Sequence, residues 1–143
     1  MSLKSACQES FIKVIASVYR MKEEIEKWWK QTLNDVEVAH ILFHNKKYDY
    51  GSFWCQQAAE KALKTLLLQH GHELIKTHDL VLLARKVTAP EDIIQLCKEL
   101  TPVYIETRYP ALGDEGFKEF TKKETEEDIQ RMEKIVQWVK KNL

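Results

Sequence analysis

Glycine and proline are scarce in this chain, which has four glycines and three prolines in 143 residues. Because these two residues supply many of the tight turns in proteins, the elements must be few and long, which favours helices. No stretch approaches the roughly 20 apolar residues that a membrane span needs. The first eight residues also lack the basic start and apolar run of a signal peptide. We therefore expect a cytoplasmic protein with no membrane partner.

Cysteine and net charge are equally uninformative about a special partner or compartment. The three cysteines, Cys7, Cys55 and Cys97, are far apart and form no C-x-x-C pair, so a disulfide framework is not expected and a reducing compartment fits. The 22 basic residues balance the 22 acidic residues. No overall field then draws the chain toward nucleic acid, and only a local basic patch remains open.

Apolar residues repeat every three or four positions through most of the chain, which is the spacing of amphipathic helices. This pattern predicts helices at about residues 6–22, 28–44, 52–70, 78–86, 90–100 and 121–140. The polar stretch 22–27 either continues the first helix or joins it to the second. The sequence thus predicts an all-α fold, an antiparallel bundle of five to six helices in one compact domain.

Capping residues mark several of the expected helix ends. Thr77 is a good N-cap, Thr88 to Glu91 reads as a capping box, and Gly71 suits the position just after a helix. The segment Thr121 to Glu124 and Thr125 offer caps for the last helix. Pro102 must kink or restart the helix that precedes it, because proline lacks the amide donor and clashes with the preceding turn. The segment 108–116 is expected to be a loop.

Three stretches are not explained by helix packing alone. They are Tyr48-Asp49-Tyr50 through Gln56-Gln57-Ala58-Ala59-Glu60-Lys61-Ala62-Leu63-Lys64, then Thr77-His78-Asp79-Leu80, and finally Tyr104-Ile105-Glu106-Thr107-Arg108-Tyr109-Pro110. In this order and spacing the set resembles the HEPN family (higher eukaryote and prokaryote nucleotide-binding), in its small prokaryotic Arg-Tyr-Pro type. The resemblance leaves residues 1–27 as an N-terminal helical extension and residues 28–143 as an HEPN-like up-and-down bundle.

The resemblance implies a bundle that is frequently a homodimer. Many bacterial and archaeal members are paired with a minimal nucleotidyltransferase, often in toxin–antitoxin systems. Active members are metal-independent ribonucleases, whose signature is an arginine followed after four to six residues by a histidine. Here Arg108 is followed by residues 109–115 without a histidine, so the usual general base is missing. A binding or regulatory role is therefore expected rather than catalysis.

Six residues are candidates for contacting a nucleotide or RNA: Arg108, Tyr104, Tyr109, Lys61, Lys64 and His78. The guanidinium of Arg108 suits phosphate, the tyrosines could stack on a base, and the two lysines would add positive charge from one helix face. The structural alternative is that Glu60 and Lys64 form an ordinary ion pair and that Arg108 ties a loop to Glu106 or Asp114.

Histidines elsewhere give weaker signals. At the predicted helix start, a structural role for His78 and Asp79 is favoured over a catalytic one, because an acid in the first turn is a routine helix signal. His40 and His44 have a spacing that can hold a metal, but no further ligand completes the set. We therefore expect neither a metal site nor a cofactor.

Four tryptophans, Trp28, Trp29, Trp54 and Trp138, are many for so small a bundle. They favour an interface and hence a homodimer, although partial burial along helix seams would also account for them.

Three functions follow from these observations. The first is a non-catalytic nucleotide- or RNA-binding module that works with a minimal nucleotidyltransferase. The second is a metal-independent ribonuclease with a non-standard general base, such as His78 or a tyrosine. The third is a domain that binds only another protein.

Overall fold

The computed structural model describes residues 3–109 and 119–143, and this part of the chain is mostly helical. The helices are α1 (Leu3–His44), α2 (Tyr48–Gln69), α3 (Leu80–Lys86), α4 (Glu91–Leu100), α5 (Val103–Arg108) and α6 (Lys122–Asn142). The expected all-α bundle is confirmed. The expected loop 108–116, with Asp114, lies largely outside the described residues.

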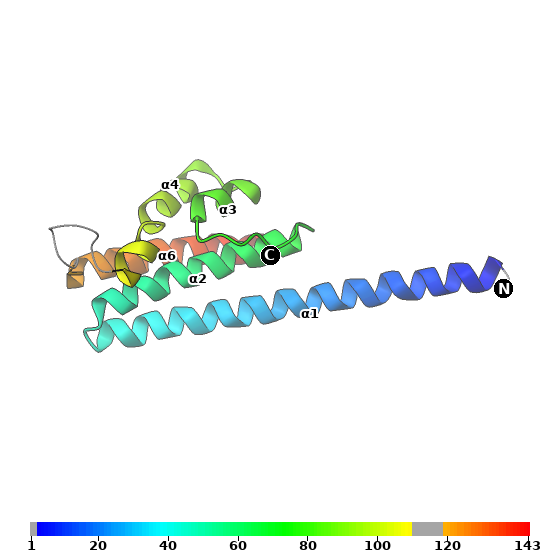
Figure 1. Cartoon of the computed structure of the whole chain (residues 1–143), viewed down its shortest axis with the longest axis horizontal. Coiled ribbons are helices and arrows are strands. Elements are labelled where there is room, and N and C mark those ends of the chain that lie inside the picture. The colour runs from blue at the N-terminus through cyan, green and yellow to red at the C-terminus, as the bar shows by residue number, and fades with distance from the viewer. Residues whose placement is uncertain (1–2, 110–118) are drawn as a thin grey trace.

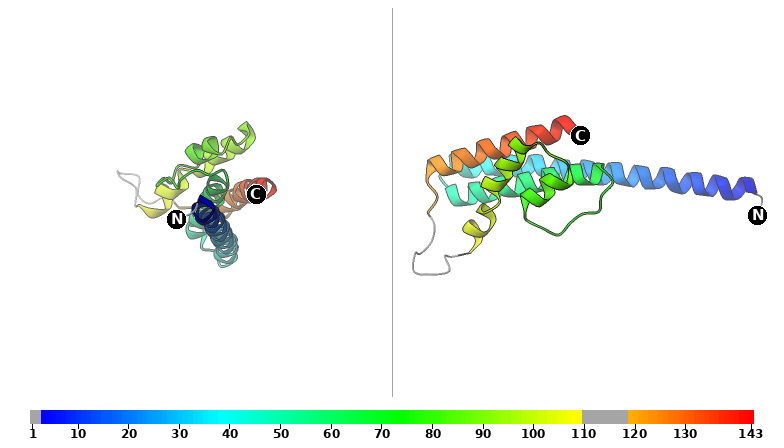
Figure 2. Two further views of the ribbon diagram at one scale, coloured as in Figure 1. Left: turned by 90° about the vertical axis from the view of Figure 1, so that its right-hand side faces the viewer. Right: turned by 90° about the horizontal axis from the view of Figure 1, so that it is seen from above.

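Three long helices form the frame of the bundle (Figure 1). α2 runs antiparallel to α1 after a short turn, and α6 packs along α2. The short helices α3, α4 and α5 cover the side of α2 and α6 that faces away from α1 (Figures 1 and 2). The core lies between these layers, and its largest fully buried apolar side chains are Leu63, Leu66, Leu67, Leu80, Leu83, Leu100, Met132 and Ile135.

Small residues let the three long helices approach one another. A Cβ at Gly51 would lie 3.2 Å from Cγ2 of Thr125 and 3.6 Å from the carbonyl oxygen of Ala39. At the same crossing the hydroxyl of Ser52 donates to Thr125 Oγ1 at 2.9 Å, and Thr125 Oγ1 donates to the Tyr48 carbonyl at 2.8 Å. This crossing fixes α2 between α1 and α6, and so sets the position of the residues that α2 contributes to the site.

The first two predicted helices are one continuous helix. α1 runs from Leu3 to His44 without a break, so residues 22–27 continue the helix. Almost every residue from Lys4 to Glu24 is exposed, and this N-terminal arm, residues 3–24, extends past the end of α2 and away from the bundle (Figure 1). None of the described helices has an apolar stretch long enough to cross a membrane.

Two predicted caps are wrong. α3 is capped by Asp79 rather than Thr77, because the Asp79 carboxylate accepts from the amides of Val81 and Leu82. Thr88 does not cap α4, which starts after Pro90. The expected cap at Thr121 is confirmed, and Glu124 completes it as a capping box. The restart of the chain into α5 at Pro102 is also confirmed.

Candidate nucleotide-binding site

Tyr104 and Arg108 are one helical turn apart on α5, so their side chains share a face of that helix. This face lies against Phe53 of α2. The guanidinium carbon of Arg108 is 5.4 Å from the ring centroid of Tyr104 and 5.7 Å from that of Phe53. Both distances are within the range of a cation–π contact. Arg108 is exposed, and no carboxylate of the described residues forms an ion pair with it.

His78 brings a third segment to the same place. Its imidazole stacks on Tyr104, with ring centroids 3.9 Å apart and the planes 14° from parallel. Phe53 lies beyond, its centroid 6.1 Å from that of Tyr104. We call Phe53, His78, Tyr104 and Arg108 the aromatic–arginine cluster. It joins α2, the segment before α3, and α5, which are far apart in the sequence.

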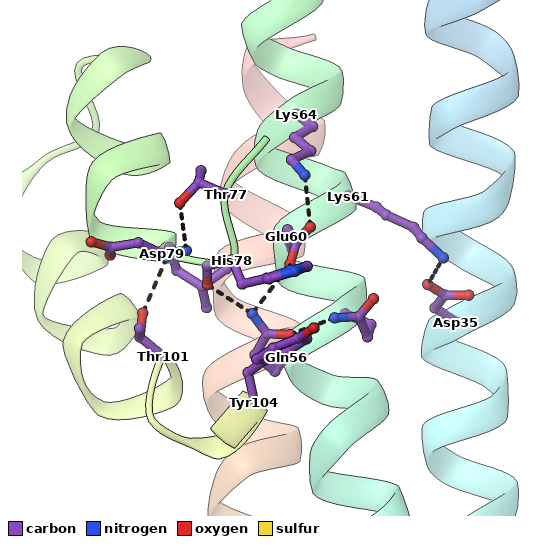
Figure 3. Close-up of polar contacts among 12 residues, drawn as sticks. Asp35, Gln56, Glu60, Lys61, Lys64, Thr77, His78, Asp79, Thr101 and Tyr104 are labelled. Atoms are coloured by element: carbon purple, nitrogen blue, oxygen red, sulfur yellow. Dashed lines mark hydrogen bonds and ion pairs between the residues drawn. The ribbon is translucent and has the colours of Figure 1, made fainter. Parts of the chain in front are cut away.

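A buried carboxylate holds His78 in this position (Figure 3). Glu60 of α2 has a side chain only 7% exposed, and its Oε2 lies 2.9 Å from Nδ1 of His78. Since an ionised carboxylate only accepts hydrogen bonds, Nδ1 carries the proton and donates. Gln56 adds a second tie, because its Nε2 donates to the His78 carbonyl at 3.1 Å. The Nε2 atom of His78 is then left to face other partners, and the side chain is 52% exposed.

The two candidate lysines are both held in ion pairs. Nζ of Lys64 lies 2.7 Å from Glu60 Oε1, and its side chain is 11% exposed. Lys61 points the other way, toward α1, where its Nζ lies 2.5 Å from Oδ2 of Asp35 (Figure 3). The pair of Glu60 and Lys64 is thus the structural alternative expected from the sequence. Arg108, Tyr104 and His78 lie together, with Lys64 behind them, whereas Lys61 lies on another side of α2.

Tyr109 follows α5 and lies at the edge of a surface hollow of about 580 Å³. The hollow is also lined by Arg108, by Tyr48 and Tyr50 at the start of α2, and by Phe120 before α6. Its size is typical of a small-molecule site. The charged side chains that line it are Lys46, Arg108, Asp49, Glu106 and Glu119, two basic and three acidic, so attraction for phosphate would come from Arg108 and Lys46 locally.

Of the weaker candidates, His40 pairs with a carboxylate and the four tryptophans are partly covered. Nε2 of His40 lies 2.8 Å from Oε1 of Glu133, which links α1 to α6. Among the described residues no three histidine, cysteine, aspartate or glutamate side chains are grouped as a metal would require. The tryptophans Trp28, Trp29, Trp54 and Trp138 are all half-buried.

Sequence reasoning did not name Phe53, Gln56 or Glu60 as site residues, although Gln56 and Glu60 stand in the first of the three unexplained stretches. Gln56 and Glu60 are buried polar residues one turn apart on an otherwise apolar helix face. Buried polar groups need partners, and that was the available signal. Phe53 gave none, since an aromatic residue at helical spacing normally marks a core position.

The profile of the HEPN domain matches residues 25–142 of the chain, which is most of its length. The chain belongs to the HEPN family. Two crystal structures are similar to it. TT1696 from Thermus thermophilus superposes with a TM-score of 0.77 and 31% identity, covering 83% of this chain and 98% of the other. ST0689, an archaeal HEPN homologue, has a TM-score of 0.71 and 34% identity, covering 82% of this chain and 95% of the other.

No protein of curated function matches the chain significantly. HEPN membership supports a general association with nucleotides and RNA. It also sets the N-terminal arm apart, because the HEPN match begins at residue 25.

Proposed function

We propose that this HEPN chain is a non-catalytic module that binds a nucleotide or an RNA end at the aromatic–arginine cluster. The observation that carries the proposal is Arg108, an exposed guanidinium that lies over two aromatic rings and lines the surface hollow. Arginine is permanently charged and matches phosphate with a planar fork of donors. Arg108 is exposed and lines the surface hollow, so its guanidinium can reach an anionic ligand there.

The neighbouring side chains suit the rest of a nucleotide. Tyr109 is 56% exposed and borders the same hollow as Arg108, so its ring offers a stacking surface for a base. Tyr104 is covered on one face by His78, and its contribution is to hold Arg108 in place. Lys64 is buried against Glu60 and Lys61 against Asp35, so neither is a ligand contact in this proposal.

Absence of catalysis rests on the sequence after Arg108. Residues 109–115 contain no histidine, so the arginine–histidine signature of HEPN ribonucleases is incomplete. The proposal extends to a minimal nucleotidyltransferase as partner, in a toxin–antitoxin-like pair. That part rests on the pairing that is common among bacterial and archaeal HEPN proteins. A pull-down from cells with the full chain as bait tests it by identifying the captured protein.

A thermal-shift titration tests the ligand. The wild-type protein is titrated with ATP, GTP, AMP and a short single-stranded RNA, alongside Arg108→Ala and the control Arg85→Ala, which removes another exposed arginine, on α3. At about 100 times the dissociation constant a ligand adds roughly 2.7 kcal/mol of stability, a readily visible shift. We expect the shift in wild type and Arg85→Ala and its loss in Arg108→Ala.

Two results would contradict the proposal. A shift that survives in Arg108→Ala would place the ligand elsewhere, and no shift with any ligand would leave a module that binds only protein. The salt dependence gives an independent check. A single phosphate contact to single-stranded RNA predicts a slope of about −0.7 in a plot of log K against log salt concentration for the wild type, and a slope near zero would contradict a phosphate contact.

One observation favours a second candidate, the metal-independent ribonuclease. His78 is half exposed and is oriented by a buried carboxylate, which is the relation of base and orienting group in many active sites. RNA cleavage that persists in EDTA and is lost in both His78→Ala and Glu60→Gln would establish this activity. Cleavage at the full rate in His78→Ala would rule out His78 as the general base.

A further inference from the structure

One stripe of side chains runs the whole length of α1. Its members alternate at spacings of three and four: Cys7, Phe11, Val14, Val18, Met21, Ile25, Trp28, Thr32, Asp35, Ala39 and Leu42. This is the seven-residue repeat of a helix that packs against another helix. We call it the α1 seam. From Trp28 onward the α1 seam packs on α2, and Thr32, Asp35 and Ala39 are fully buried there.

The same seam continues into the N-terminal arm, where nothing in the described chain covers it. Phe11 is 65% exposed, Val14 57%, Val18 61% and Met21 39%. The flanking Ile15 is 38% exposed. Monomeric proteins seldom leave so long a row of large apolar side chains in water. The stripe of α1 that packs on α2 therefore continues along α1 beyond the end of α2.

An unsupported helix of this composition is also poorly stable. The arm is rich in β-branched and aromatic residues, which have low helix propensity, and most helical stability in proteins comes from packing an apolar face. A partner that covers the arm would supply that packing.

The charges of the arm favour a protein partner over a lipid surface. Residues 3–24 contain four basic side chains, Lys4, Lys13, Arg20 and Lys22, and three acidic ones, Glu9, Glu23 and Glu24, a net charge of about +1. Helices that lie on membranes normally carry a polar face rich in lysine and arginine. The mixed charge of this arm is typical of the solvated face of a helix pair.

We propose that the arm pairs with the arm of a second copy of this chain, and that the two helices run antiparallel. A parallel pair would bring both α1 seams face to face along their length, but α2 already occupies the seam from Trp28 onward. An antiparallel arm avoids this conflict. It enters in line with α2 and in the same direction, and so continues the packing that α2 begins.

The junction between α2 and the arm contains a place for the end of the partner helix. A hollow of about 470 Å³ lies there, lined by Val18, Met21, Lys22, Ile25, Glu26 and Gln69. Gln69 is the last residue of α2. The first turn of the second copy's arm would fill this hollow, next to the end of α2.

This placement sets the register of the pair. If the second copy's arm starts beside Met21, then Phe11 of each copy lies next to Val14 of the other, and Cys7 lies next to Val18 of the other. The two Cys7 residues are then about 17 Å apart along the axis, from a rise of 1.5 Å per residue.

Light scattering after size-exclusion chromatography tests the pairing on the full chain. We expect the wild type at twice its chain mass of 16.9 kDa, and Phe11→Glu and Val18→Glu at the single mass. The matched control is Ala16→Glu, which places the same charge on an exposed position of the arm's opposite face and should leave the dimer intact. A monomeric wild type at about 100 μM, or a dimer that survives both seam variants, would overturn the proposal.

Cross-linking tests the direction. With native Cys7 kept, Val18→Cys should form a disulfide-linked dimer on mild oxidation, whereas Val18→Cys combined with Cys7→Ser should not. Rapid linkage of the wild type through Cys7 alone would show a parallel pair and refute the antiparallel one. Wild-type monomers that bind vesicles of mixed neutral and anionic lipids would show that the arm serves a membrane surface instead.

Discussion

Asp35 places a carboxylate between α1 and α2, where its side chain is 1% exposed. Taking an ionised group out of water is costly unless it is paired and hydrogen-bonded. Here Lys61 supplies the opposite charge, and Gln31 Nε2 donates to the other carboxylate oxygen at 2.9 Å. Lys61 is therefore a structural residue, although its type and position on the helix had suggested a ligand contact.

Replacing Lys61 should expose this dependence. Lys61→Met leaves the Asp35 carboxylate buried without its cation, and removing one partner of a buried pair costs about 3–5 kcal/mol. Since Lys61 is 22% exposed, water can reach the site and we expect about 2 kcal/mol. Urea unfolding measures the loss. The double variant Asp35→Leu/Lys61→Met should recover most of it, and an unchanged midpoint in Lys61→Met would contradict this account.

The cysteines differ in reactivity because they differ in burial. Burial raises the pKa of the Cys97 thiol to about 12, with Asp79 adding to the shift. Burial also raises the pKa of Cys55 well above its ordinary value, assisted by Asp128 and Glu133. The reactive species is the thiolate. We expect a disulfide reagent at pH 8 to label Cys7 in the folded protein and all three cysteines in denaturant.

The same shifts give a pH dependence of stability. Both thiols have a higher pKa when folded than when unfolded, so they favour the folded state fully below the unfolded value of about 8.5. That contribution declines as the pH rises from about 8.5 toward 12. The free energy of unfolding in urea should therefore decrease over this pH interval. For Cys97→Ala it should decrease less steeply than for the wild type. Equal slopes would contradict the assignment.

Residue contacts could be predicted from the sequence where they are local. The pair of Glu60 and Lys64 was foreseen as an alternative, because residues four apart on a helix are neighbours. The contacts of His78 with Glu60 and with Tyr104 were not. They join segments 18 and 26 residues apart, and only the packing of α5 and the pre-α3 segment against α2 brings them together.

Three helices of this chain end at a residue with positive φ, and only one of these residues is glycine. α1, α2 and α3 each finish with paired reverse hydrogen bonds around one such residue: Lys46 (φ 60°), Gly71 (φ 79°) and Thr88 (φ 54°). At Thr88 the bonds run from its own amide to the Arg85 carbonyl and from the Ala89 amide to the Ala84 carbonyl. This is the Schellman arrangement.

Thr88 therefore belongs to the end of α3, which explains why the capping box predicted for α4 is wrong. A β-branched residue is strained at positive φ. We expect Thr88→Gly to stabilise the protein by about 0.5–1 kcal/mol, the relief of strain being partly offset by the flexibility of glycine in the unfolded chain. Thr121→Ala, which removes a true cap, should cost about 1 kcal/mol. Thermal unfolding of both variants checks the opposite signs.

The helix boundaries that were predicted well have local causes. Thr121 and Glu124 satisfy each other across one turn, and proline at 102 cannot continue a helix. The fusion of the first two predicted helices was left open, because residues 22–27, Lys-Glu-Glu-Ile-Glu-Lys, are good helix formers but also resemble a polar connection.

At the scale of the whole molecule, the arm and the bundle are expected to be energetically separate. Nearly all residues from Lys4 to Glu24 are exposed, and the HEPN match starts at residue 25. Deleting residues 1–24 should leave the melting temperature of the bundle, measured at low protein concentration, within a few degrees of wild type. A loss of cooperative unfolding would show that the arm supports the core. At high concentration only the full chain should gain stability, by mass action.

Because α1 is one unbroken helix, it is a rod of fixed length. Forty-two helical residues span about 63 Å at 1.5 Å per residue, and no proline or glycine lies within them to act as a joint. Two such rods that overlap over about 18 residues would measure roughly 100 Å from tip to tip. The ligand sites would then sit in bundles at opposite ends, too far apart to share one nucleotide. Such a dimer would be bivalent, able to hold two separate RNA ends or partner molecules at a set spacing.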